Sequence, residues 1–294
     1  MSAIGIPSKR SLRRVGRTVL VETQIAGRRL ANRGSLPEFV IVGAQRSGTT
    51  SLFRCLMEHP VIIPNVLGTK GVHFFDTNYS RSIDWYLSHF ASKQSRLAVE
   101  SSAGQPAIAG EASPYYLYHP AGAQRMKALI PDAKMIVLLR DPVARAQSHY
   151  EHMVWEGYEP LPTLEDALDA EPERLAGEAE RLLADPTATS HAHQHFSYID
   201  RGRYDEQLAR LFEHYPRKQV LVIATDELTS DPDPVLLRVQ SFLGLEPDPA
   251  ITLARRNAGD YDKLAPATRD RLTAEFAANN RRLTELLDCE FSWT

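Results

Sequence analysis

A short glycine-containing loop follows the apolar residues 39–42 and carries hydroxyl groups and one cation. It reads Gly-Ala-Gln-Arg-Ser-Gly-Thr-Thr-Ser from residue 43 to residue 51. The spacing from Gly43 to Gly48 is that of the ATP-binding loop G-x-x-x-x-G-K-[ST], but Thr49 stands where that loop has its phosphate-binding lysine. The cation lies inside the loop, at Arg46. This pattern predicts a site for a phosphate-like group, in a protein that does not cleave a γ-phosphate.

The loop can bind an anion in several ways at once. Gly43 and Gly48 permit backbone conformations in which neighbouring amide groups converge on one ligand. A helix that begins near Thr49 adds its positive N-terminal end, and the guanidinium of Arg46 can hold two oxygens together. We therefore expect six consecutive positions to bind the anion: Arg46, Ser47, Gly48, Thr49, Thr50 and Ser51.

A second cation follows the apolar run 135–139. Asp141 and Pro142 have the residue types of a helix cap and a first helical residue, which leaves Arg140 at the carboxyl end of a strand. Ser148 falls in the second turn of that helix. Arg140 and Ser148 could bind a second phosphate, the alternative being an Arg140–Asp141 ion pair and a surface serine. Two anion sites on one sheet edge suit a nucleotide phosphorylated at both its 5′ and 3′ positions.

The segments that must position these residues alternate between strands and helices. Short apolar runs predict buried strands at 39–42, 107–109, 135–139 and 220–224, and helical patterns cover 50–58, 121–130, 142–155, 204–214, 235–243 and 266–288. This alternation predicts an α/β fold, a P-loop-containing three-layer domain with a central, mainly parallel sheet flanked by helices. Ligands of such sheets bind beyond the carboxyl ends of the strands, where both anion sites are expected.

Composition sets the wider frame. The chain has 294 residues, 43% of them hydrophobic, and a net charge of −3, which argues against a general nucleic-acid binder. Residues 1–36 predict a basic arm ahead of a domain at 37–294; the arm is either solvated or in weak contact with an acidic membrane or polymer. Its apolar stretch is too short for a secretory signal or a membrane span, so we expect a cytoplasmic protein. Residues 159–190 predict an insertion of surface helices over the site.

Several motifs taken together resemble the sulfotransferases that use 3′-phosphoadenosine 5′-phosphosulfate (PAPS). The loop 43–51 and the segment 138–150 resemble the two cofactor signatures of that family. Further segments resemble its heparan-sulfate and carbohydrate branch, and the likeness runs in order from about residue 37 to the end of the chain. These segments are 71–76, 84–86, 111–116, 201–204 and 242–245.

The resemblance implies transfer of a sulfuryl group from PAPS to a hydroxyl, less often an amine, of a carbohydrate, glycolipid or small metabolite. It implies that the loop holds the 5′-phosphosulfate and that Arg140 and Ser148 hold the 3′-phosphate, with Arg255 and Arg256 as a looser match to a basic segment near that phosphate. No metal is expected, because a sulfonate carries less charge than a γ-phosphate. Arg46 stands where many relatives have lysine, and it is assigned electrostatic stabilisation.

Three residues compete for the role of catalytic base. His73 ranks first because an imidazole titrates near neutral pH, with Asp76 as its orienting partner or replacement and Glu111 next. The alternatives are a core histidine and a structural carboxylate. Enzymes of the heparan type commonly have Glu where this chain has Gly71, and often Lys where it has Ala112. These departures favour, as one rival, a PAPS- or glycan-binding protein that has lost its base; the other rival is a P-loop kinase or NTPase.

Other residues have two readings each. Lys70 is expected either to contact the acceptor or cofactor or to be a solvated loop lysine. The histidines at 191, 193 and 195 fit a role facing the acceptor or the surface better than a metal site. Four aromatic residues could stack on an acceptor or belong to the core: Trp85, Tyr115, Tyr116 and Tyr204.

Overall fold

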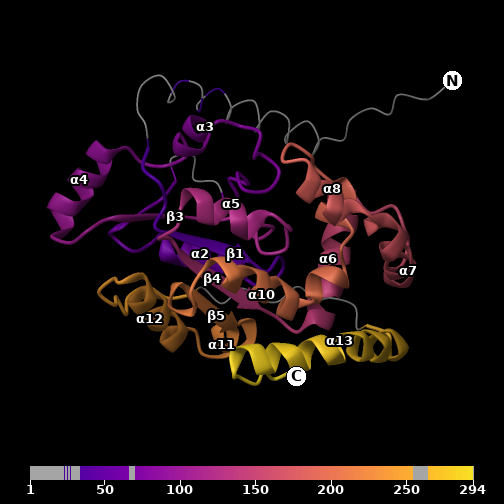
Figure 1. Cartoon of the computed structure of the whole chain (residues 1–294). Helices are drawn as coiled ribbons and strands as arrows, with labels where there is room; N and C mark the ends of the chain where they lie inside the picture. The colour runs from indigo at the N-terminus through magenta and orange to yellow at the C-terminus, as the bar shows by residue number, and fades with distance from the viewer. Residues whose placement is uncertain are drawn as a thin grey trace.

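Five parallel strands form the centre of the structure, a computed structural model that describes residues 34–65, 70–253 and 264–293 together with Thr23, Ile25 and Gly27. The strands run in the order β2-β3-β1-β4-β5 (Figure 1). Their bounds are β1 (Phe39–Gly43), β2 (Ile62–Ile63), β3 (Ile108–Ala112), β4 (Lys134–Leu139) and β5 (Val220–Ala224). Because β1 lies between β3 and β4, its carboxyl end opens at the point where the strand order reverses, the usual ligand position in such sheets.

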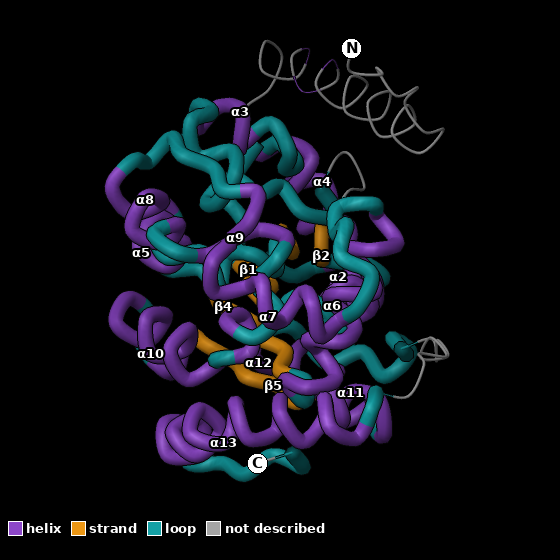
Figure 2. Tube along the Cα trace, turned by 90° about the vertical axis from the view of Figure 1, so that its right-hand side faces the viewer, coloured by secondary structure: helices purple, strands orange, loops and turns teal. Residues whose placement is uncertain are grey.

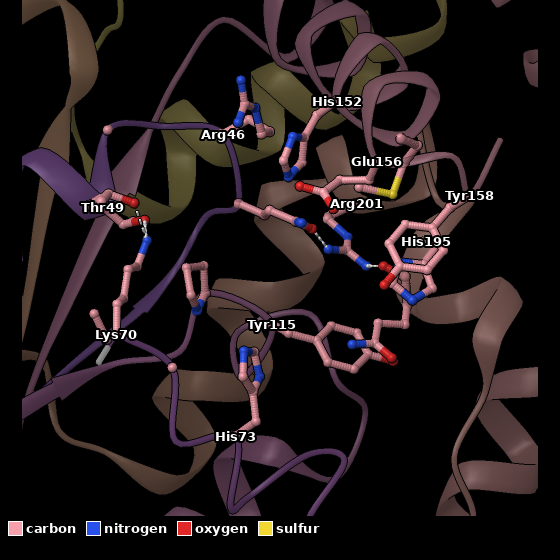
Figure 3. A pocket seen from close by; sticks show the side chains of 18 residues that line it. Arg46, Thr49, Lys70, His73, Tyr115, His152, Glu156, Tyr158, His195 and Arg201 are labelled. Carbon is pink, nitrogen blue, oxygen red and sulfur yellow. Dashed lines mark hydrogen bonds between the residues drawn. The ribbon is translucent and has the colours of Figure 1, made fainter. Parts of the chain in front are cut away.

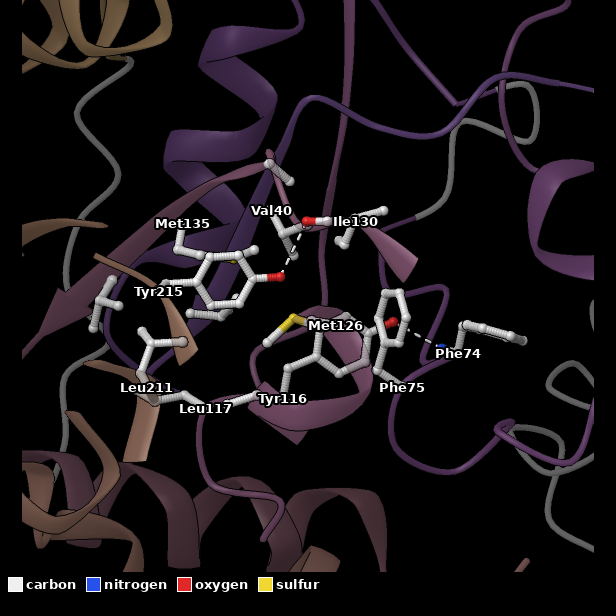
Figure 4. Close-up of a cluster of buried hydrophobic side chains, with 14 of the residues drawn as sticks. Val40, Phe74, Phe75, Tyr116, Leu117, Met126, Ile130, Met135, Leu211 and Tyr215 are labelled. Carbon is white, nitrogen blue, oxygen red and sulfur yellow. Dashed lines mark hydrogen bonds between the residues drawn. The ribbon is translucent and has the colours of Figure 1, made fainter. Parts of the chain in front are cut away.

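Helices cover both faces of the sheet. Alternate residues of β1 point to opposite sides, so Phe39 and Ile41 pack under α2 (Thr49–Leu56) and α12 (Pro232–Leu243). Val40 and Val42 pack under α5 (Gly122–Leu129) and α10 (Tyr204–His214), in the cluster drawn in Figure 4. Figure 2 shows α5 and α10 on one side of the strands and α2 and α11 (Thr225–Ser230) on the other. The three layers of the predicted α/β fold are therefore present.

The remaining helices surround the carboxyl edge of the sheet and its periphery. They are α3 (Ile83–Leu87), α4 (Lys93–Ala103), α6 (Pro142–Glu156), α7 (Leu164–Leu175), α8 (Glu178–Ala184), α9 (His191–His195) and α13 (Pro266–Leu287), with short turns η1 (Asp200–Gly202) and η2 (Arg217–Gln219). The segment 159–190 contains α7 and α8. Val143, Leu168 and Phe276 share one apolar cluster, which fastens α7 and α13 to α6.

The predicted elements and the observed ones differ in instructive places. All four predicted strands and all six predicted helices exist, each within a few residues of its expected bounds. The strand expected at 107–109 continues to Ala112, and the two-residue strand β2 was too short to show a pattern. Helix α4 was not predicted because none of its residues is buried, so it has no apolar stripe to recognise.

Candidate active site

The loop after β1 turns sharply into α2. Arg46 and Gly48 adopt left-handed backbone conformations with φ of 73° and 85°, and Gly48 is the N-cap of α2. The amide of Leu52 donates to the carbonyl of Gly48 (3.2 Å), so the helical ladder leaves the amides of Thr49 and Thr50 for a ligand. Successive amides in such a turn form a concave site for an anion. The loop therefore has the geometry that its spacing predicted.

The segment after β4 lies against this loop. The carboxylate of Asp141 caps α6 by accepting from the amide two residues on (3.0 Å), as expected. The Nε of Arg46 donates to the Oγ of Ser148 (3.1 Å), and the Nη1 of Arg140 donates to the backbone oxygen of Arg46 (3.3 Å). The structure thus brings the two expected phosphate sites into direct contact.

Lys70 adds a cation to the loop from a separate segment of the chain. Its Nζ donates to the hydroxyls of Thr49 (2.8 Å) and Thr50 (2.6 Å), as Figure 3 shows. Burial, followed by the charges of Arg46 and Arg54, lowers the pKa of Lys70 to about 7. Lys70 is therefore not a solvated loop lysine: it contacts the loop 43–51, beside the threonine that replaces the loop lysine.

His73 and Asp76 form a hydrogen-bonded pair. The side chain of His73 lines a cavity that it shares with the loop and Lys70. The Nδ1 of His73 lies 2.8 Å from the Oδ2 of Asp76; the His73 side chain is 33% exposed and that of Asp76 is fully buried. Burial lowers the pKa of His73, but the charge of Asp76 and its hydrogen bond outweigh burial and raise the pKa above its usual value. The pKa of Asp76 is lowered by His73 despite burial, so Asp76 is a carboxylate that orients the imidazole. The Nε2 of His73 is left for a substrate.

Glu111 lies behind this pair and is not part of the cavity wall. Its buried carboxylate accepts from the hydroxyls of Tyr86 (2.7 Å) and Ser113 (2.9 Å). The Ser113 hydroxyl in turn accepts from the backbone amide of His73 (3.1 Å). Burial raises the pKa of Glu111 to about 7, although these hydrogen bonds favour the carboxylate. Of the two expected roles of Glu111, base or structural carboxylate, this placement favours the structural carboxylate, which reaches His73 through Ser113.

The two departures from the heparan-type pattern both line the cavity. Gly71 has a φ of +83°, and a Cβ at this position would lie 2.8 Å from the Nε2 of His73. A residue with a side chain would be strained there and would meet the imidazole. Ala112, at the end of β3, lines the same cavity. Gly71 therefore leaves room for the His73 imidazole, which a side chain at this position would meet.

The cavity has a volume of about 540 Å³, in the range that encloses a small molecule. In Figure 3 Thr49 and Lys70 lie on one side and Tyr158 and His195 on the other, with Arg46 beside His152 at the top and His73 at the bottom. We call one side the loop wall, formed by Arg46, Gly48, Thr49, Thr50 and Lys70. We call the other side the helical wall, formed by Tyr115, His152, Glu156, Tyr158, Gln194 and His195.

The helical wall went mostly unrecognised in the sequence. Tyr158 stacks on His195 with ring centroids 4.1 Å apart and an interplanar angle of 17°, and His191 packs against both rings. His193 points elsewhere, its Nδ1 lying 2.7 Å from the hydroxyl of Tyr115. The available signal was helical spacing, since residues four apart share a face of a helix and residues two apart do not.

Arg201 is a buried cation between the two walls, only 1% exposed. Its Nε donates to the Oγ of Ser197 (3.0 Å), and its Nη1 donates to the side chain of Gln45. Its Nη2 donates to the backbone oxygens of His193 (2.9 Å) and Gln194 (2.8 Å). Burial lowers its pKa to about 10, so it stays charged at neutral pH. Arg201 thus joins the helical wall to the loop through its own hydrogen bonds.

The other candidates fall into three groups. Of the aromatic residues named as stacking candidates, Tyr115 lines the cavity, whereas Trp85, Tyr116 and Tyr204 belong to the apolar core. No group of three or more His, Cys, Asp or Glu side chains in the described part of the chain is arranged to hold a metal ion. Arg255 and Arg256, and the basic residues of the N-terminal arm, lie outside the described residues.

Comparison with known proteins identifies the family of this chain. The family model described as "Sulfotransferase domain" matches residues 36–275. The chain belongs to the sulfotransferase family. A solved sulfotransferase from Alicyclobacillus acidocaldarius is similar at 30% identity, covering 88% of this chain and 99% of that one with a TM-score of 0.63. The resemblance inferred from the motifs and the assignment as an enzyme are confirmed.

Two relatives of this sulfotransferase are named for different properties, one for its membrane association and the other for its substrate. Membrane-associated sulfotransferase kil1 of Dictyostelium discoideum is 25% identical over 88% of this chain and 66% of its own length. Human heparan sulfate glucosamine 3-O-sulfotransferase 3A1 is 32% identical over 74% of this chain and 47% of its own length. The chain thus spans less than two thirds of either relative. Over its described residues, the sulfotransferase has no helix whose length and apolar content would carry it across a bilayer.

Proposed function

We propose that this sulfotransferase transfers the sulfuryl group of PAPS to a hydroxyl of a carbohydrate, glycolipid or small-molecule acceptor, releasing 3′,5′-bisphosphoadenosine. One observation carries the proposal: the loop, hydrogen-bonded to Arg140 and Ser148, lines the same cavity as His73, whose imidazole is held by Asp76. The loop and its neighbours would bind a donor with two phosphates, and His73 would serve an acceptor that needs a base.

The donor side follows from the contacts of the loop. The free amides of Thr49 and Thr50 and the guanidinium of Arg46 would bind the 5′-phosphosulfate, and Arg140 and Ser148 the 3′-phosphate. PAPS supplies the sulfuryl group and a phosphate leaving group. Arg46 stands at the loop, where negative charge grows on that leaving group, and Lys70 joins it as a second cation when the bound anion restores its proton. The residues of the loop thus need no metal ion for this role.

The acceptor side depends on His73. Its Nδ1 is held by the buried Asp76 carboxylate, so its Nε2 can accept the proton of the acceptor hydroxyl as the S–O bond forms. Asp76 keeps the ring oriented and stabilises the imidazolium that results. Glu111 supports the backbone of His73 through Ser113. Each of the three competing residues thereby receives a different role.

A release assay tests the proposal. The full chain is incubated with PAPS and an acceptor panel, and bisphosphoadenosine and sulfated product are measured together; the same protein is incubated with ATP. Matching yields of both products are expected. ADP or phosphate from ATP would instead indicate a kinase or NTPase. Tight bisphosphoadenosine binding without any sulfated product would indicate the binding protein that has lost its base.

We also propose a cytoplasmic location, with a weak contact between the basic residues 1–36 and acidic lipid. The charge of this segment motivates the proposal, and so does the membrane-associated relative. Co-sedimentation with phosphatidylserine vesicles at low salt should retain the full chain. Equal retention on neutral phosphatidylcholine vesicles would contradict an electrostatic contact.

A further inference from the structure

The charges around the cavity are distributed unevenly. Among the described lining residues the basic ones are Arg46, Lys70 and Arg201, and the one carboxylate is Glu156. Arg46 and Lys70 belong to the loop wall and face the donor. Four of the five N–H groups of Arg201 are hydrogen-bonded within the protein. The helical wall therefore brings no lysine or arginine of its own to an acceptor.

His152, which lies beside Arg46 in Figure 3, adds no charge to the helical wall. His152 lines the cavity, and burial, together with the charge of Arg46, lowers its pKa. It is thus neutral near pH 7 and carries no charge to pair with an anionic acceptor. A sulfate or carboxylate held against Tyr158 and His195, on the far side from Arg46 and Lys70, would lose its water without gaining a lysine or arginine partner, which is costly.

The insertion beside the helical wall is acidic. Residues 159–190 hold nine Asp and Glu residues and two arginines, a net formal charge of −7. Both arginines are paired within the segment, Arg174 with Glu159 (2.7 Å) and Arg181 with Glu178 (2.6 Å). Helices α7 and α8 both pack against α9, which carries His195. A polyanion approaching the helical wall would meet this negative field.

The same wall offers a surface for a ring. Tyr158 and His195 form a stacked pair that lines the cavity, and Tyr115 adds a third ring. Aromatic rings pack well against other rings and against the apolar face of a sugar. Gln194 can donate and accept hydrogen bonds without bearing charge.

We propose that the acceptor is an uncharged ring compound bearing a free hydroxyl, a neutral sugar or a phenol, and that polyanionic glycans are disfavoured. The inference rests on the proposed sulfuryl transfer and concerns the other half of the same cavity. It separates this chain from the human relative, which is named for heparan sulfate, a polyanion.

Three acceptors test the inference with the full chain and PAPS: methyl β-cellobioside, 2-naphthol and an N-sulfated heparosan octasaccharide. We expect sulfation of at least one neutral acceptor with kcat/KM about tenfold or more above that of the octasaccharide, and with a KM that hardly changes with salt. The first two compounds distinguish a sugar from a phenol. Preferred sulfation of the octasaccharide, or its competition with a neutral acceptor, overturns the proposal.

Variants of the helical wall sharpen the result. Tyr158→Ala should raise the KM of the neutral acceptor about tenfold and leave bisphosphoadenosine affinity unchanged, whereas Tyr158→Phe keeps the ring and should behave nearly as wild type. Glu173→Lys with Glu180→Lys, both exposed, should increase turnover of the octasaccharide only. An unchanged KM in Tyr158→Ala, with a normal melting temperature, contradicts the ring surface.

The two proposals can fail separately. A full chain that does not bind bisphosphoadenosine would remove the proposed sulfuryl transfer itself. A chain that binds it and sulfates the octasaccharide in preference keeps that function and loses the neutral acceptor.

Discussion

The two walls of the cavity are built in different ways. The loop wall comes from strand ends and one helix start, and it is joined by hydrogen bonds such as Arg46–Ser148 and Lys70–Thr49. The helical wall comes from α6, α9 and the residues around them, joined by ring stacking such as Tyr158–His195. We propose that the loop wall recognises the donor and the helical wall the acceptor, with Arg201 linking the two. Substituting a ring of the helical wall should therefore leave donor binding intact.

The largest effect is expected at the residue between the walls. His73→Ala should lower kcat by about two to four orders of magnitude, because a positioned base contributes this much to a proton transfer. Bisphosphoadenosine affinity, measured by calorimetry, should stay near that of wild type. A nearly normal kcat would contradict His73 as the base and would shift that role to Asp76.

Removing a donor-side cation should produce the next largest effect. Arg140→Ala should weaken bisphosphoadenosine binding about tenfold to a hundredfold, because hydrogen bonds to a charged group contribute about 1.5–3 kcal/mol. Exposed Arg281, on α13, gives the matched control, and Arg281→Ala should bind as wild type. Equal affinities of the two variants would contradict the assignment of Arg140 to the second phosphate.

Lys70 offers a finer probe of the loop wall. Since its pKa is lowered to about 7, it is largely neutral at pH 8, and a bound anion should restore its proton. Binding of bisphosphoadenosine at pH 8 should therefore take up a fraction of a proton, seen as different calorimetric enthalpies in Tris and in Hepes. Lys70→Met should abolish this uptake and lower affinity about tenfold. Uptake that persists in Lys70→Met would assign the proton to another group.

The smallest shift concerns pH. The pKa of His73 is raised above its usual value, and a base acts only when neutral, so kcat should fall as the pH drops through that raised pKa. Asp76→Asn removes the charge that raises it, and the acid limb should move to lower pH while the maximal rate also falls. A limb that stays in place in Asp76→Asn would mean that it reports a group other than His73.

The sequence predicted the loop wall better than the helical wall. The turn after β1 and the helix cap at Asp141 depend on residues that are close in the sequence. The spacing of those residues therefore predicted both features. Strand periodicity alone does not show which polar groups bind the Glu111 carboxylate. One partner, Tyr86, comes from a distant helix, and the other, Ser113, lies just after the end of the strand. The sequence did not predict that Tyr158 lines the cavity, because its position depends on stacking with His195, 37 residues further along the chain.

The sequence by itself determined the parallel sheet, the anion loop at its carboxyl edge and the cations Arg46 and Arg140. These features arise from local backbone preferences and from the rule that parallel strands end at the same edge. Only the tertiary structure decided that Lys70 serves the loop and that Tyr158 and His195 form one surface opposite it. Such contacts join segments tens of residues apart, and packing rather than sequence spacing brings them together.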